Sequence, residues 1–132
     1  MSRILVDTSA YSAFLKGVEE IKLAVQRAEA IYLNPIVLGE LRAGFLRGGR
    51  REKNESELRA FLSSPRVSML GLDEETASRY AVIRNALWQA GTPIPVNDIW
   101  IAATAMQYGL RVLTTDSHYM SVQQVIVDYV SR

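Results

Sequence analysis

Short apolar runs that end at polar, helix-capping residues recur along this chain, and they restrict its fold more than any other feature. Residues 4–6 precede Asp7, residues 30–33 precede Asn34, and the run at 111–114 ends near Asp116. Continuous apolar runs of this length are typical of strands that are buried on both faces, as in parallel sheets. After the first two runs, the capping residue predicts a helix that begins at Thr8 or Ser9 and another that begins at Pro35.

Helical spacing and helix start and stop signals occupy most of the chain between these runs. We expect helices over about 9–15, 18–28, 35–47, 52–62, 73–91 and 99–108, with further strands over 67–70 and 125–127. The helix at 99–108 is apolar almost all round, which predicts a central, buried element. Strands separated by helices predict an α/β fold with a mostly parallel central sheet.

The length of 132 residues fits one domain, which we expect to span residues 1–132. Fifteen basic against fourteen acidic residues leave a net charge of +1, so a strongly cationic nucleic-acid coat protein is excluded. The absence of cysteine excludes a disulfide scaffold, a thiolate zinc site and a cysteine nucleophile. Neither a membrane-spanning run nor an export signal is apparent, so we expect a cytoplasmic protein without a membrane partner.

Four of the fourteen acids lie at or inside apolar segments, where a carboxylate is costly: Asp7, Glu40, Asp98 and Asp116. Asp7 and Asp116 follow predicted strands, whose carboxyl ends form the usual ligand crevice of a parallel sheet. Asp98 can face the same crevice from the start of a buried helix. Two carboxylates 4 Å apart repel by roughly 4 kcal/mol at an effective dielectric near 20, so such a cluster must protonate, splay apart or hold a cation. An oxygen-rich set fits Mg²⁺ or Mn²⁺ better than zinc.

Each of these acids also has a purely structural explanation. Asp7 and Asp98 could be helix caps, and Asp116 could be a turn residue. Glu40 could be an exposed helix residue paired with Arg42 or Arg47. The sequence leaves these alternatives open for each acid taken alone.

Four short motifs, in a fixed order, carry a resemblance to a known family. They are VDTS at 6–9, GEL at 39–41, NDIWIAA at 97–103 and LTTDSHY at 113–119. With these motifs, the chain resembles the PIN-domain ribonucleases, and specifically the VapC-type toxins of toxin–antitoxin pairs. The resemblance extends from Asp7 to about Tyr119. Two departures concern only the C-terminal edge: His118-Tyr119 stands where the family often has His-Phe, and no glycine precedes the last expected strand.

The resemblance implies a three-layer α/β/α fold and a Mg²⁺-dependent endoribonuclease, with Mn²⁺ as a possible substitute. Asp7, Glu40, Asp98 and Asp116 would surround the metal, supported by Thr8 and Thr114. Glu40 could complete the metal cage or orient the attacking water. The resemblance also implies an RNA substrate, a homodimer, and a cognate antitoxin whose C-terminal segment reaches toward the acids.

Basic residues are concentrated just after Glu40, at Arg42, Arg47, Arg50, Arg51 and Lys53. They could contact RNA phosphates, meet an acidic antitoxin segment, or simply complement the dipole of a helix end. His118 could be a general acid or base, although a lone histidine beside a turn is more often a structural hydrogen-bond partner.

Three other readings compete with a metal-dependent nuclease. A phospho-acceptor receiver domain would need a second acid after the first strand and a lysine after a late strand, and this chain has neither. A metal-free ribonuclease would need a second histidine beside His118. A catalytically silent PIN-fold binding module is the third, and the presence of all four acids argues against it.

Overall fold

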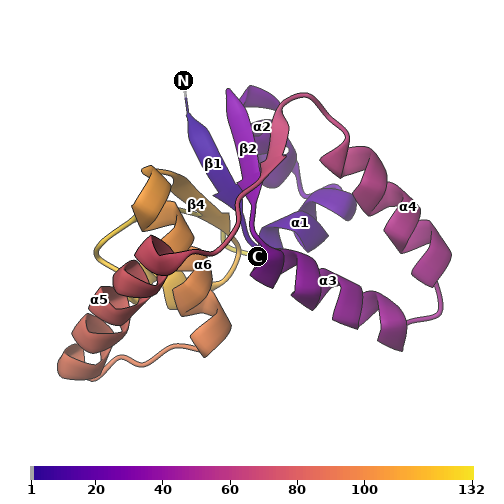
Figure 1. Cartoon of the computed structure of the whole chain (residues 1–132). Helices are drawn as coiled ribbons and strands as arrows, with labels where there is room; N and C mark the ends of the chain where they lie inside the picture. Colours follow the sequence, from indigo (N-terminus) through magenta and orange to yellow (C-terminus); the bar gives the residue numbers. More distant parts are fainter. Residues whose placement is uncertain (1) are drawn as a thin grey trace.

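The computed structural model of the chain describes residues 2–132 and contains a five-stranded sheet (Figure 1). The strands lie in the order β3-β2-β1-β4-β5, and each neighbouring pair is parallel. Their bounds are Arg3–Val6 (β1), Ala30–Leu33 (β2), Val67–Met69 (β3), Arg111–Thr114 (β4) and Ile126–Tyr129 (β5). The predicted parallel sheet is confirmed.

Six α-helices connect the strands within the described residues. Their bounds are Thr8–Leu15 (α1), Glu19–Arg27 (α2), Pro35–Arg47 (α3), Arg51–Leu62 (α4), Glu74–Ala90 (α5) and Val96–Tyr108 (α6), and a 3₁₀ helix, η1, covers Ser117–Ser121. In Figure 1, α5 and α6 lie together on one side of the sheet, while α1 and α2 lie on the other. Helices α3 and α4 form a hairpin that extends away from the sheet. The three-layer α/β/α architecture is therefore as expected. No helix in residues 2–132 is long and apolar enough to cross a membrane.

Local capping signals set most of the helix boundaries. The Asp7 side chain caps α1, and Asn34 caps α3 immediately before Pro35. Asp73 and Thr76 form a reciprocal capping box at the start of α5, and Gly91 ends that helix with a φ of 72°, a conformation that favours glycine.

The structure corrects two of the expected boundaries. Helix α6 begins at Val96 with Pro95 as its cap, so Asp98 lies inside the first turn and does not cap the helix. Strand β5 covers Ile126–Tyr129 instead of 125–127, because its ladder follows the register of β4, in which Arg111 faces Ile126.

The two central strands and α6 form the core that positions the functional residues. Strands β1 and β4 lie side by side, with Val6 opposite Leu113, and all but the first residue of each is buried. In α6 the buried residues are Ile99, Ile101, Ala102, Ala103, Thr104 and Ala105, which confirms the prediction of a central helix. Asp7 and the residues after Thr114 therefore emerge next to each other at the carboxyl edge of the sheet.

Candidate active site

Asp7 lies where β1 ends, and its carboxylate is almost fully buried, with 3% of the residue exposed. Its Oδ1 accepts a hydrogen bond from the Ala10 backbone N–H at 2.8 Å, which is the capping bond of α1. The Ser9 hydroxyl lies 2.9 and 3.0 Å from the two oxygens, and Thr114 donates to Oδ2 at 2.7 Å. A carboxylate offers about four acceptor positions, so the three donors leave room for a cation. Asp7 is thus a cap that can still act as a ligand.

Thr114 connects the end of β4 to Asp7 of β1. Its hydroxyl donates to Asp7 and accepts from the Asp116 backbone N–H at 2.9 Å. The Ser9 hydroxyl accepts from the Thr115 backbone N–H at 3.0 Å, which adds a second link between the two strand ends. These bonds hold the segment that carries Asp116 next to the end of β1, although the two are far apart in the sequence.

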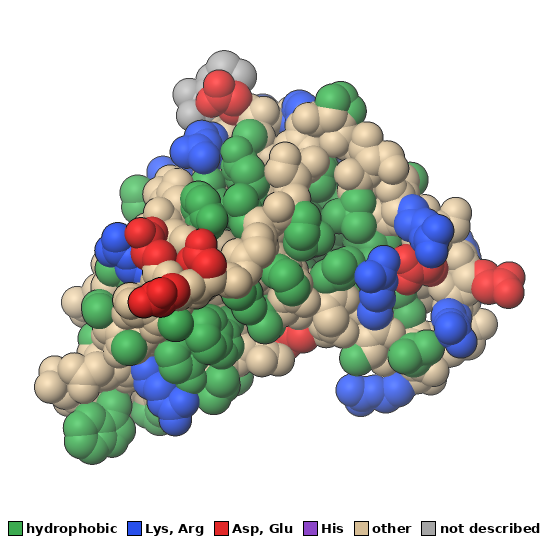
Figure 2. All heavy atoms as spheres, viewed as in Figure 1, with side chains coloured by type: hydrophobic (Ala, Val, Ile, Leu, Met, Phe, Trp, Pro, Cys, Tyr) green, Lys and Arg blue, Asp and Glu red, His purple; other side chains and the backbone are tan. Residues whose placement is uncertain are grey.

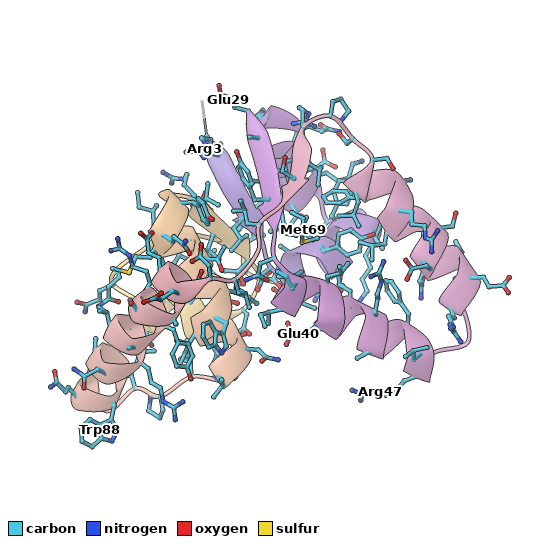
Figure 3. The ribbon with its side chains drawn as sticks, in the orientation of Figure 1. Arg3, Glu29, Glu40, Arg47, Met69 and Trp88 are labelled. Carbon is cyan, nitrogen blue, oxygen red and sulfur yellow. The ribbon has the colours of Figure 1, made fainter. Side chains whose placement is uncertain are left out.

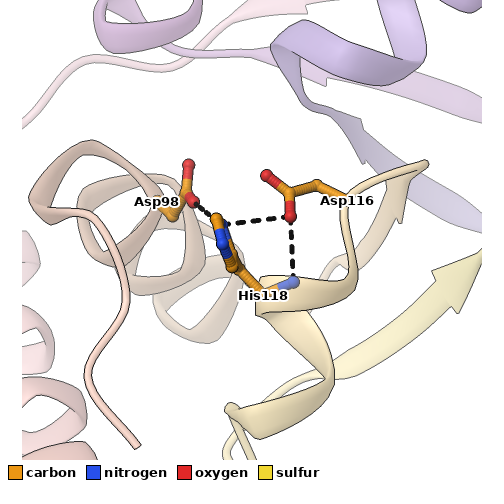
Figure 4. A group of neighbouring side chains, drawn as sticks. All are labelled: Asp98, Asp116 and His118. Carbon is orange, nitrogen blue, oxygen red and sulfur yellow. Dashed lines mark hydrogen bonds and ion pairs between the residues drawn. The ribbon is translucent and has the colours of Figure 1, made fainter.

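Asp98, Asp116 and His118 form the tightest group of potential metal ligands (Figure 4). One ligand atom of each lies within 4.8 Å of the others. His118 Nδ1 lies 3.2 Å from Asp98 Oδ2 and 3.1 Å from Asp116 Oδ1, so the ring bridges the two carboxylates. The buried Tyr119 hydroxyl donates to Asp98 Oδ1 at 3.3 Å. Asp7 and Glu40 lie outside this 4.8 Å group.

Glu40 reaches the same site from the first half of α3. The Thr8 hydroxyl donates to Glu40 Oε1, and the Asn97 amide donates to Oε2 at 3.1 Å. Glu40 pairs with neither Arg42 nor Arg47. The structural explanation of Glu40 as an exposed residue in an ion pair is therefore wrong. Both of its oxygens are held by neutral donors from α1 and α6, which fixes the carboxylate between these helices.

Burial and mutual repulsion destabilise the negative charges of this site. Burial raises the pKa of Asp7 from 3.8 to about 6, and the nearby Asp98 adds to the rise. The pKa of Asp98 is also raised, first by burial and then by Asp116 and Glu40. The pKa of the Tyr119 hydroxyl is raised by burial and by Asp7 and Asp98. Hard oxygen ligands in such a negative, half-buried cluster suit a divalent cation, which would remove the repulsion.

The four arginines that follow Glu40 have different surroundings. Arg42 is held by Glu55 through two contacts, at 3.2 and 2.9 Å. Arg47 lies in the last turn of α3, where a cation complements the helix dipole, but Arg50 and Arg51 lie at the start of α4, where it does not. The dipole explanation is therefore wrong for the last two. Figure 2 shows basic side chains gathered over α3 and α4.

Three polar residues of the site were not singled out from the sequence as its members. Ser9 contacts both oxygens of Asp7, Asn97 contacts Glu40, and Tyr119 contacts Asp98. Ser9 and Asn97 lie within or beside the motifs that contain Asp7 and Asp98, so their positions could have marked them. Tyr119 ends the motif that contains Asp116, but an aromatic residue near a strand end is usually core, so its polar contact with Asp98 became evident only in the structure.

Comparisons with known proteins agree with this geometry. A family model described as the PIN domain matches residues 4–124. The chain is 32% identical over 127 residues to a protein named Ribonuclease VapC4 from Mycobacterium tuberculosis, covering 95% of each chain.

Solved structures of toxin–antitoxin proteins are among those that resemble the fold. The FitAcB structure from Neisseria gonorrhoeae contains a chain that superimposes with a TM-score of 0.74 at 31% identity, covering 94% of this chain and 95% of that one. A member of the VapBC family of toxin–antitoxin systems, VapBC-5 from Mycobacterium tuberculosis, gives a TM-score of 0.76 at 25% identity, covering 98% and 100%.

Proposed function

The chain belongs to the PIN-domain family, and from this premise we propose that it is a metal-dependent endoribonuclease and the toxin of a toxin–antitoxin pair. The observation that carries the proposal is the continuous series of hydrogen bonds and ion-pair contacts from Asp7 through Thr114, Asp116 and His118 to Asp98. A helix cap or a turn residue has no need of such a series. The relative named Ribonuclease VapC4 supports RNA as the substrate.

Asp7, Asp98 and Asp116 would hold Mg²⁺, for which Mn²⁺ could substitute, and Glu40 would complete the cage or orient the attacking water. The bound ion would make a water molecule more nucleophilic and stabilise the charge on the leaving oxygen. Thr8 and Asn97 hold Glu40 in one orientation, and Thr114 does the same for Asp7. Because these contacts are formed without substrate, the acids are already oriented when RNA binds.

The same proposal assigns two kinds of protein partner. A cognate antitoxin is supported by the similarity to VapBC-5, a member of the VapBC family of toxin–antitoxin systems. A homodimer rests on the family resemblance, and light scattering during gel filtration would test it, with twice the chain mass of 14.8 kDa as the expected result. The match to the PIN family removes the receiver domain as an alternative.

The direct test is cleavage of a mixed RNA pool by the purified chain, with Mg²⁺ and with EDTA. Asp98→Asn keeps the shape of the side chain but removes its charge, so we expect it to abolish cleavage and leave the circular dichroism spectrum unchanged. Glu75→Gln, a charge removal on the exposed start of α5, is the matched control and should cleave normally. Undiminished metal-dependent cleavage by Asp98→Asn would defeat the assignment of the site. Absence of cleavage by the wild type would favour the silent binding module.

A further inference from the structure

A hollow of about 570 Å³ opens beside the acids, between α3 and the start of α6. Thr8, Glu40 and Asn97 of the acid site line it, and Arg47 lines it from the C-terminal end of α3. Gly39 and Ala43 also line it. The hollow therefore begins at the proposed reacting centre and continues along one helix to a single cation.

The helical period places Glu40 and Arg47 on the same face of α3. Seven residues are almost two full turns, so the two positions are about 10 Å apart along the axis. Figure 3 shows both side chains on the same side of α3. At a rise of about 3.4 Å per stacked nucleotide, this distance corresponds to two or three nucleotides of one strand.

Gly39 is a glycine inside a helix for which the fold gives no packing reason. Its φ is not positive, and a Cβ at this position would meet nothing within 4 Å. Glycine inside a helix lowers stability relative to other residues. What its missing side chain does provide is space in the hollow next to Glu40. Gly44 lies in the same helix with the same free surroundings, but it does not line the hollow.

Arg47 is the arginine of this region that is available to a ligand in the hollow. Arg42 is occupied by Glu55, and Arg51 lines a separate hollow on α4. Arg47 is exposed and takes part in none of the ion pairs found among residues 2–132. Among the described residues of the basic group, Arg47 is therefore the one that lines the hollow beside the acids and has a guanidinium free of ion pairs.

We propose that the α3 face formed by Gly39, Ala43 and Arg47 is the track of the RNA strand, in which the backbone passes over Gly39 and Ala43 and Arg47 binds a phosphate two or three nucleotides from the cleaved bond. This inference rests on the proposed ribonuclease function. In this proposal Arg47 is a substrate-binding residue, and the missing side chain of Gly39 lets the RNA strand reach the acid site.

The first test compares two glycines of α3 that both have free space around the position of a Cβ, and of which only Gly39 lines the hollow. Gly39→Gln and Gly44→Gln should both raise Tm by a few degrees, because glutamine is a better helix former. Only Gly39→Gln should obstruct the track, and we expect its RNA cleavage rate to fall about tenfold or more while Gly44→Gln cleaves like the wild type. Equal cleavage by both variants would overturn the track.

The second test measures the affinity for a fluorescent single-stranded oligoribonucleotide by anisotropy in EDTA, together with KM and kcat in Mg²⁺. Arg47→Ala should weaken binding about tenfold and lower the salt slope by about 0.7, the value for one phosphate contact on a single strand. KM should rise with kcat nearly unchanged, and Arg47→Lys should restore part of the affinity. Arg42→Ala and Arg50→Ala, which remove the same charge outside the hollow, should have little effect.

The two tests separate failure of the track from failure of the proposed function. Equal weakening by all three alanine variants would mean a general charge effect and would overturn the assignment of Arg47. Normal RNA binding by Arg47→Ala, with loss of inhibition by an acidic partner protein, would also overturn it and assign the hollow to that partner. If the wild type binds RNA through Arg47 but cleaves none, the track stands and the nuclease function fails.

Discussion

Asp7 combines two roles that a carboxylate seldom has at once, as the cap of α1 and as a buried member of the acid site. Its raised pKa means that the ionised form destabilises the folded state when no cation is bound. The rise from 3.8 to about 6 corresponds to about 3 kcal/mol when the group is fully ionised. This destabilisation is fully present at pH values above the pKa of Asp7 in the folded state, and it disappears at pH values below the pKa of Asp7 in the unfolded state.

We therefore predict that Asp7→Asn stabilises the protein in EDTA at pH 7, by about 1–3 kcal/mol, because the buried charge is removed and the hydroxyls of Ser9 and Thr114 can reorient. As the pH falls from 7 to 4, the wild type gains stability and the difference between the two proteins shrinks. Urea unfolding at several pH values measures this. A difference that is independent of pH would contradict the assigned cause.

Asn97 acts on the site through Glu40. Asn97→Ala leaves one Glu40 oxygen without its donor, so we expect cleavage to fall by about 10–100-fold with little change in KM, the usual effect of losing such an orienting contact. Asn85→Ala, at an exposed position of α5, is the matched control. Steady-state kinetics with one RNA substrate measures the effect. Equal cleavage rates for Asn97→Ala and Asn85→Ala would show that Glu40 needs no orientation by Asn97.

At the scale of elements, the site is assembled by the ends of β1 and β4, by the starts of α1 and α6, and by the first half of α3, which carries Glu40. The ends of β1 and β4 and the start of α1 could be predicted from local signals, because capping residues act over a few residues. For α6 the sequence predicts a start at Ile99, three residues after the true start at Val96. Pro95 replaced the expected polar cap, and this moved Asp98 from the cap to the first turn.

Gly91 offers a prediction at this scale. Its φ of 72° ends α5, and an L-residue in that conformation costs about 1–2 kcal/mol. Gly91→Ala should lower the free energy of unfolding by this amount and leave cleavage unchanged, because α5 contributes no residue to the acid site. Gly71→Ala, whose backbone lacks positive φ, is the control for chemical denaturation. Equal stability of the two variants would show that the αL stop is dispensable.

At the scale of the whole molecule, the acid site links the two halves of the chain, since Asp7 and Glu40 come from the first half and Asp98 and Asp116 from the second. A cation bound there would stabilise only the folded state. At a concentration 100 times its Kd, the gain is about 2.7 kcal/mol.

We predict that Mg²⁺ raises Tm of the wild type in a concentration-dependent way and that EDTA reverses the rise. Asp98→Asn should abolish the shift, whereas Glu75→Gln should retain it. Differential scanning fluorimetry measures this without any RNA, so the metal site is tested separately from the nuclease activity. A shift of equal size in Asp98→Asn would place the ion elsewhere.

The sequence by itself determined the order of strands and helices along the chain, the parallel sheet, and the four acids that are candidates for the site. These features depend on local spacing, on capping and on the cost of placing a carboxylate in an apolar segment. Only the tertiary structure decided that Ser9, Asn97 and Tyr119 contact the acids and that His118 bridges two of them. It also decided that Arg42 is occupied by Glu55 and that Arg47 lines the hollow. The reason is physical: hydrogen bonds and ion pairs depend on distances between side chains, and in a folded chain those distances are set by packing between elements far apart in the sequence.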